Sequence, residues 1–307
     1  MKIYRRMMCV MLLVLCCITD AAGQQYDTSG IRNIQLDSFV VKSGFNMNSF
    51  IKRVKNDTTF YKAFKSMHLV PFNAVNSFTA VDKKGRVIAS MHTNAQQRLN
   101  TKRCRTTTFS NQTVTGDFYK RDKKTINYYT AELFYNLFYS DKPVCNQNDI
   151  VAGSMVLKDK SRMEKNKYEL KQLIFNPGSK VDGVPFMGDK ASVFDADEVE
   201  KYDLKISQEM YDSEEVFVFN VTPKPEYKNK VVYNELKTWF RRSDYSIVAR
   251  DYALSFNTLF YDFDVHMKVR MKQMNNKLYP TLIDYDGNWY VATQGRERMK
   301  VVMQIAY

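Results

Sequence analysis

The residues that could carry out nucleophilic, acid–base or metal chemistry are few and scattered in this sequence. Its three histidines are His68, His92 and His266, and none has a second histidine, a cysteine or a carboxylate at metal-ligand spacing. The sequence also lacks the Gly-x-Ser-x-Gly, His-Glu-x-x-His and Cys-x-x-Cys motifs of hydrolases, zinc proteases and redox proteins. We therefore expect a protein that is not an enzyme and that uses no cofactor and no metal.

Two segments imitate ligand-binding motifs. Gly183–Lys190 contains glycines and a proline like a phosphate-binding loop, but Asp189 occupies the position of the required lysine. Because a carboxylate there would repel phosphate, we interpret the segment as a connector. Four carboxylates fall between Asp195 and Glu200, without the glycine turn and the distant glutamate of a calcium loop. We expect them to form the first turn of a short helix.

The clearest structural pattern is Tyr261–Lys272, in which every odd position is apolar and every even position is polar or charged. Such a strand buries one face and exposes the other, so His266 is expected on the exposed face. The apolar face then needs a cover. A helix predicted at Ile126–Tyr139, whose apolar residues recur at helical spacing, could supply it.

Between this strand and this helix we expect either an ordinary core or a cavity that accepts an apolar ligand. The chain has 16 methionines, whose flexible side chains adapt to irregular apolar shapes. The cavity interpretation assigns eight candidate ligand-binding residues, which are Phe263, Val265, Met267, Val269 and Met271 of the strand and Leu133, Phe134 and Leu137 of the helix.

The other periodic segments predict helices first and then strands. Asn48 is expected to cap a short helix that reaches Val54. Asp57 is expected to cap a second helix that reaches Met67, after which the helix dipole would favour a charged His68. A further helix is expected at Met163–Phe175, followed by a breaker at 176–178. The remaining predicted strands are Val75–Asp82, Arg86–His92, Thr106–Tyr119, Tyr202–Tyr211, Val216–Thr222, Val231–Arg241, Lys277–Tyr285, Trp289–Thr293 and Met299–Tyr307, with turns at Lys83–Gly85, Asn275–Asn276 and Asp286–Gly287.

These elements predict an α+β fold, in which a strongly curved antiparallel sheet has helices on its concave side. Residues 24–307 are long enough for a single domain with a large core. In that domain residues 24–150 supply helices and strands, and residues 151–307 supply a helix and an antiparallel meander.

The first 23 residues have the layout of a secretory signal peptide. Three basic residues precede the apolar run Met7–Ile18, and Ala21–Gly23 forms a small-residue cleavage site. The run is shorter than the roughly 20 residues that span a membrane. We expect cleavage after Gly23 and a periplasmic or outer-membrane-associated protein. The alternative is acylation of Cys16, which would anchor the protein to a membrane.

The formal net charge of +13 is spread over the chain. Because acidic residues interleave with the basic ones, a solvated surface is the simplest interpretation. The charge also allows an anionic membrane surface or envelope proteins as partners, whereas export excludes nucleic acid.

Cys104 and Cys145 are the cysteines that remain once the signal peptide is removed. In an exported protein such a pair favours one disulfide bond. Closing a loop of about 40 residues would stabilise the fold by about 4 kcal/mol. The alternative is two buried free thiols.

Three segments resemble the C-terminal half of a group of exported Bacteroidetes envelope proteins: Val216–Lys224, Tyr245–Tyr252 and Phe260–Arg270. Their succession of strands, a lysine-rich turn and a long alternating strand is similar to the LolA/LolB lipoprotein-carrier fold. The resemblance covers roughly residues 200–307. It implies a LolA-like incomplete barrel that wraps over helices, and a lipid or acylated ligand.

Two alternatives remain open at this stage. The protein could be a structural or protein-interaction module of the envelope, with a sheet that is filled by its own side chains. The aromatic-rich alternating strands and the terminal Tyr307 also suggest an outer-membrane β-barrel, against which the predicted helices and the basic surface count.

Overall fold

The computed structural model describes residues 34–36, 45–148, 171–172, 174–178, 192–257, 261–291 and 295–307. The predicted signal peptide and the connector Gly183–Lys190 lie outside the described residues. Most of the helix predicted at Met163–Phe175 also lies outside them, and its described C-terminal residues are helical.

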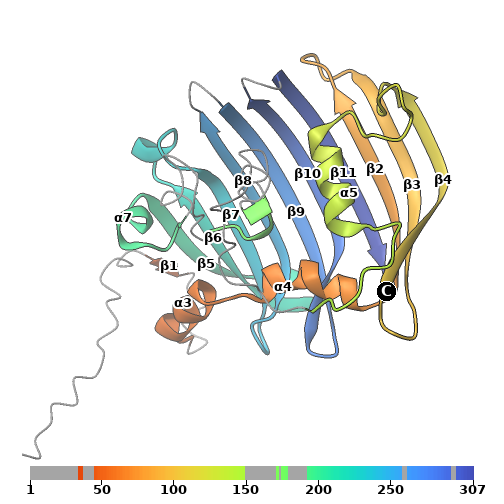
Figure 1. Ribbon diagram of the computed structural model, residues 1–307. Coiled ribbons are helices and arrows are strands. Elements are labelled where there is room, and N and C mark those ends of the chain that lie inside the picture. Colours follow the sequence, from red (N-terminus) through yellow and green to blue (C-terminus); the bar gives the residue numbers. More distant parts are fainter. Residues whose placement is uncertain are drawn as a thin grey trace, which may run out of the picture.

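The described residues form one sheet of eleven strands with short helices (Figure 1). The strands are β1 (Ile34–Leu36), β2 (Phe72–Val81), β3 (Val87–Leu99), β4 (Arg105–Gly116), β5 (Tyr202–Tyr211), β6 (Glu214–Pro223), β7 (Tyr233–Arg241), β8 (Ile247–Asn257), β9 (Tyr261–Met274), β10 (Lys277–Val291) and β11 (Gly295–Ala306). The helices are α3 (Met47–Lys55), α4 (Thr59–Ser66), α5 (Tyr129–Phe138) and α7 (Ala196–Val199), with 3-10 turns η2 (Met67–Leu69) and η3 (Pro225–Tyr227).

The strand order is β1-β5-β6-β7-β8-β9-β10-β11-β2-β3-β4, so the sheet is open and not closed into a full barrel. Only the pairing of β1 with β5 is parallel within these strands; the others are antiparallel. Figure 1 shows a strongly curved sheet with α4 and α5 on one face. This confirms the predicted fold class, an α+β protein with a curved antiparallel sheet and helices on the concave side.

The two halves of the chain meet where β11 pairs with β2. Val301 lies opposite Phe78 and Met303 opposite Asn76, so the C-terminal strand continues directly into the N-terminal hairpin. This long-range pairing places α5, which follows β4 in the chain, in front of β11 and β2 (Figure 1).

The alternation predicted for β9 is confirmed. Val265 and Val269 are completely buried, whereas His266 on the opposite face is exposed. The predicted Asn275–Asn276 turn joins β9 to β10, and both residues have the positive φ that such a hairpin requires.

The turn predicted at Asp286–Gly287 is wrong, because β10 continues through both residues and pairs with β9 and β11. The reason is the ring of Tyr285, which lies over Gly287. A Cβ atom at Gly287 would come within 2.0 Å of the Tyr285 hydroxyl oxygen. This glycine therefore serves the close approach of an aromatic side chain within a strand, not a turn.

The first helices form as predicted, with one correction. The N-cap of α3 is Asn46, whose side chain accepts a hydrogen bond of 3.0 Å from the Ser49 backbone N–H, and not Asn48. The N-cap position of α4 is Thr58, which makes no side-chain cap hydrogen bond. The Asp57 carboxylate, one residue earlier, accepts hydrogen bonds from the backbone N–H groups of Thr59 and Phe60 and so fills the capping role predicted for it. Within the described part of the chain, no helix is long and apolar enough to cross a membrane.

Candidate functional site

The residues predicted to contact a ligand all face the concave core. Phe263, Val265, Met267 and Val269 are between 0 and 3% exposed, and Met271 is partly buried against the same cluster. In α5, Phe134 is fully buried and Leu133 nearly so, while Leu137 is partly buried. The structure therefore brings the strand and helix residues into one apolar cluster, and their role in binding remains a prediction.

Aromatic rings connect α5 to the sheet. The Phe134 ring lies 5.1 Å from that of Tyr285 on β10 and 5.7 Å from that of Phe175. Phe138, one turn later, is 5.7 Å from the same Phe175 ring. Such tilted ring pairs each stabilise the packing by roughly 1 kcal/mol beyond their buried area.

Charged side chains from the sheet hold both ends of α5. The Glu297 carboxylate on β11 accepts hydrogen bonds from the backbone N–H groups of Tyr129 and Thr130, at 2.7 and 2.8 Å. At the other end the buried Arg105 Nη1 donates to the Phe138 carbonyl oxygen at 3.2 Å. A carboxylate at the helix N-terminus and a cation at its C-terminus both interact favourably with the helix dipole. We call α5 with these two residues the α5 latch.

A disulfide bond joins Cys104, directly before β4, to Cys145 after α5. The two backbone hydrogen bonds between Arg105 and Val144 lie beside it, at 2.9 Å each. The bond therefore closes a loop that contains all of α5.

His68 is neutral in this setting, contrary to the charge expected near a helix C-terminus. Burial, and then the positive charge of Arg105, lower the pKa of His68 from 6.5 to about 3. Removal from water and a neighbouring cation outweigh the helix dipole here.

A second polar group lies in the core near α4, around Arg250 of β8. This arginine is only 7% exposed, and its Nε donates a 3.0 Å hydrogen bond to Thr238 Oγ1. Its guanidinium lies 4.3 Å from the centre of the Phe60 ring. In the described ranges no carboxylate is within salt-bridge distance of it. We call Arg250, Thr238, Phe60 and the two tyrosines described next the Arg250 cluster.

Two buried tyrosines complete the Arg250 cluster. The Tyr252 hydroxyl donates a hydrogen bond to the Ile174 carbonyl oxygen. The Tyr233 side chain is completely buried, and its hydroxyl donates no hydrogen bond to a described residue. Burial raises the pKa of Tyr233 to about 12, although the Gly178 backbone N–H and the charge of Arg250 act in the opposite direction. The Arg250 charge and the Tyr233 hydroxyl therefore act on each other inside the core.

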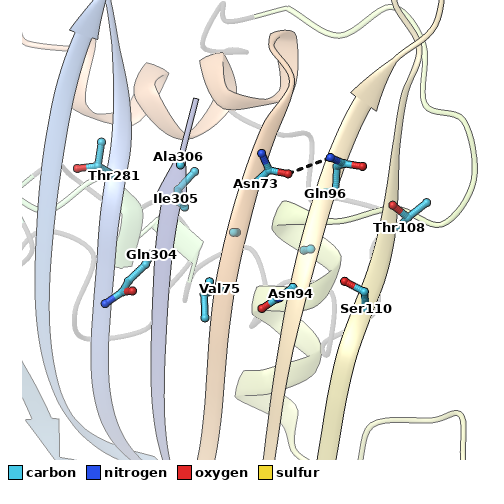
Figure 2. A pocket seen from close by; sticks show the side chains of 12 residues that line it. Asn73, Val75, Asn94, Gln96, Thr108, Ser110, Thr281, Gln304, Ile305 and Ala306 are labelled. Atoms are coloured by element: carbon cyan, nitrogen blue, oxygen red, sulfur yellow. Dashed lines mark hydrogen bonds between the residues drawn. The ribbon is translucent and has the colours of Figure 1, made fainter.

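The outer face of the sheet carries a shallow trough of about 680 Å³ over β11, β2, β3 and β4 (Figure 2). Two adjacent cross-strand rows line it, Gln304–Val75–Asn94–Ser110 and Ala306–Asn73–Gln96–Thr108. The Gln96 side chain donates to Asn73 Oδ1 at 3.0 Å, the contact drawn in Figure 2. Seven of its twelve lining residues carry an amide or hydroxyl group and five are apolar, so the trough is mixed in polarity, unlike the apolar concave face.

Metal ligation has no support in the part of the chain that the structure describes, where no cluster of three or more potential ligands occurs. The acidic segment forms the short helix α7, with Asp197 and Glu198 in its first turn, as predicted. Glu198 instead makes an ion pair of 2.5 Å with Lys201.

Sequence reasoning missed the Arg250 cluster and the α5 latch. One signal was available for Arg250, since it shares a period-two face with Tyr252 and Leu254, where a charge is out of place. Nothing in the local sequence links Glu297 to the start of α5, because 167 or more residues separate them.

No protein-family model matches the chain, and no curated protein matches it. Among solved structures it is similar to a domain from Vibrio parahaemolyticus described as an outer membrane lipoprotein-sorting protein, at 12% identity and a TM-score of 0.25, over 80% of this chain and 89% of that one. A DUF1329 family protein from Desulfovibrio piger gives 10% and 0.22, over 81% and 92%. A LolA superfamily protein from Nitrosomonas europaea gives 9% and 0.21, over 82% and 92%. Such scores support no argument about function.

Proposed function

We propose that the protein is a non-enzymatic carrier or binder of the cell envelope that accepts an apolar or acylated ligand, a lipid or a lipoprotein, on the concave face under α5. The resemblance of its C-terminal strands to exported Bacteroidetes envelope proteins and to lipoprotein carriers supports this placement. An anionic membrane surface or envelope proteins would be its other partners, since the chain carries a net charge of +13.

The observation that carries the proposal is the way α5 covers the apolar face. The helix has ten residues and buries Phe134 and Phe138 completely. Its ends are held by Glu297 and Arg105 through polar contacts, which water or a partner can replace. Opening this cover would expose aromatic and methionine side chains, which rearrange around an acyl chain at little cost.

A filled core is the alternative, and one observation favours it. Val265, Val269 and Phe134 are completely buried without any ligand, so the side chains already occupy the space between β9 and α5. In that case the protein would be a structural or interaction module, whose function depends on its surface.

Native mass spectrometry of the protein purified from its own envelope, followed by lipid extraction, distinguishes the two. We expect a lipid or acylated peptide to co-purify with the protein and to be released when α5 moves away from the sheet. A ligand-free mass, together with no uptake of fluorescent fatty acids, would contradict the carrier proposal and leave the filled core.

Substitution on the apolar face tests the same point. Val265→Glu and Met267→Arg should abolish ligand binding and destabilise the fold by roughly 3 kcal/mol or more, because each places an unpaired charge in the core. His266→Glu on the exposed face of the same strand is the matched control and should change neither ligand binding nor stability. Melting curves recorded beside the binding data separate lost binding from lost structure.

A further inference from the structure

Arg250 places a positive charge in the core, and no carboxylate of the described residues forms an ion pair with it. Arginine stays protonated in proteins, and burying a charge without a partner is costly. Burial lowers the pKa of Arg250, and the nearby Asp57 counteracts this. No ion pair joins the two side chains in the described part of the chain, where the Asp57 carboxylate accepts hydrogen bonds from the Thr59 and Phe60 backbone N–H groups.

Hydrogen-bonding capacity is also unused at this place. The guanidinium has five N–H donors, and the contact with Thr238 uses only the one on Nε. No hydrogen bond joins the two terminal nitrogens to the described residues. The Tyr233 hydroxyl adds a further donor, which is buried and donates to none of the described residues. A guanidinium edge with a hydroxyl close by is the donor set that binds a carboxylate or phosphate in bidentate fashion.

The Arg250 cluster adjoins the apolar row of β9. Arg250 lies opposite Val269, and Tyr252 lies opposite Met267 in the same pairing of β8 with β9. A chain that follows this row from Val269 to Val265 would therefore have its polar end at Arg250.

We propose that the Arg250 cluster is the binding site for the anionic head group, a carboxylate or a phosphate, of a single-chain amphiphile whose apolar chain lies along Val265, Met267 and Val269. This inference rests on the proposed function and names its ligand class. Arg250 contacts the anion through its terminal nitrogens, the Tyr233 hydroxyl donates to it, and Thr238 fixes the orientation of the guanidinium.

Isothermal titration calorimetry with three ligands of equal chain length tests the proposal. Dodecanoate and dodecyl phosphate carry the two candidate anions, and dodecanol carries neither. We expect at least one anion to bind the wild-type protein about tenfold or more tightly than the alcohol, as charged hydrogen bonds predict. The tighter of the two anions identifies the head group.

Two substitutions locate the effect. Arg250→Met should remove the preference for the anion and leave dodecanol affinity within about twofold, because it removes only charge and donors. Arg250→Lys should keep part of the preference, since it retains the charge without the planar pair of donors. An unchanged preference in Arg250→Met would overturn the assignment.

The remaining outcomes separate this inference from the proposed function. If the wild-type protein binds all three ligands equally, the anion site is wrong and the apolar site stands. If none of the three binds, both are wrong. Should Arg250→Met fail to fold, Tyr233→Phe decides, because it removes a hydroxyl that donates to no described residue and is expected to fold normally. It should lower the anion preference about threefold or more, and no change would count against the site.

Discussion

The concave face has two polar regions that differ in how their charges are used. In the α5 latch, Glu297 and Arg105 each contact backbone groups at one end of the helix. In the Arg250 cluster, the guanidinium contacts one hydroxyl and one aromatic ring of the described residues, and the Tyr233 hydroxyl donates to none of them. The first region therefore uses its charges to hold the cover in place, whereas the second keeps donors available inside the core.

This difference shows how one apolar face can be covered by a helix and can also hold the donors that would recognise a ligand. A buried charge that caps a helix contributes to stability, because the orphan carbonyl or N–H groups at helix ends need partners. A buried charge without such a partner costs stability, so a ligand that pairs with it is a physical reason for its presence. Stability measurements should therefore respond to the α5 latch and binding measurements to the Arg250 cluster.

The largest effect is expected from the disulfide bond that closes the loop around α5. Replacing Cys104 and Cys145 by serine should lower the free energy of unfolding by about 4 kcal/mol, because the unfolded chain gains the freedom of the open loop. Urea denaturation of oxidised, reduced and variant protein measures this. Equal stability of all three would show that the α5 latch holds the helix unaided.

The second-largest effect is expected from acid, which should destabilise the folded protein by protonating His68 beside Arg105 of the α5 latch. The pKa of His68 is about 3 in the folded protein and 6.5 when unfolded, so the unfolded state binds more protons between these values. The stabilisation from neutral His68 is complete above pH 6.5 and is lost progressively as the pH falls towards 3. His68→Met should flatten this part of the stability profile, and a profile that keeps its slope would contradict the assignment.

A matched pair of arginine substitutions compares the two regions directly. Arg105→Met should lower the free energy of unfolding by about 2 kcal/mol, because the Phe138 carbonyl loses its partner. Arg250→Met should change it by no more than about 1 kcal/mol, since removing a desolvated cation offsets the lost Thr238 contact. Equal losses of unfolding free energy for both variants would show that the α5 latch and the Arg250 cluster do not differ in how their charges contribute to stability.

The smallest effect is expected at the start of α5. Glu297→Ala should cost about 1 kcal/mol, the usual value of an N-terminal cap, and Glu297→Gln should recover part of it through one remaining acceptor. If α5 is the cover of the ligand site, Glu297→Ala should also speed the uptake of a fluorescent fatty acid in stopped-flow measurements. An unchanged rate would indicate that the ligand enters by another route.

Local signals in the sequence predicted most of the fold. The alternation of β9, the Asn275–Asn276 turn and the Asp57 cap depend on neighbouring residues, and each formed as expected. A failure came where a packing contact outweighed the local turn signal. Gly287 was interpreted as a turn residue, but the Tyr285 ring packs over it within a continuous strand.

The sequence by itself determined which face of each strand is apolar, because a period of two needs no knowledge of the neighbouring strands. Only the tertiary structure decided which faces meet. The pairing of β11 with β2 brings Glu297 to α5, and the pairing of β7, β8 and β9 brings Arg250 to Thr238 and Val269. The first pairing joins residues far apart in the chain, which no local pattern specifies, whereas the second joins consecutive strands whose register the tertiary structure fixes.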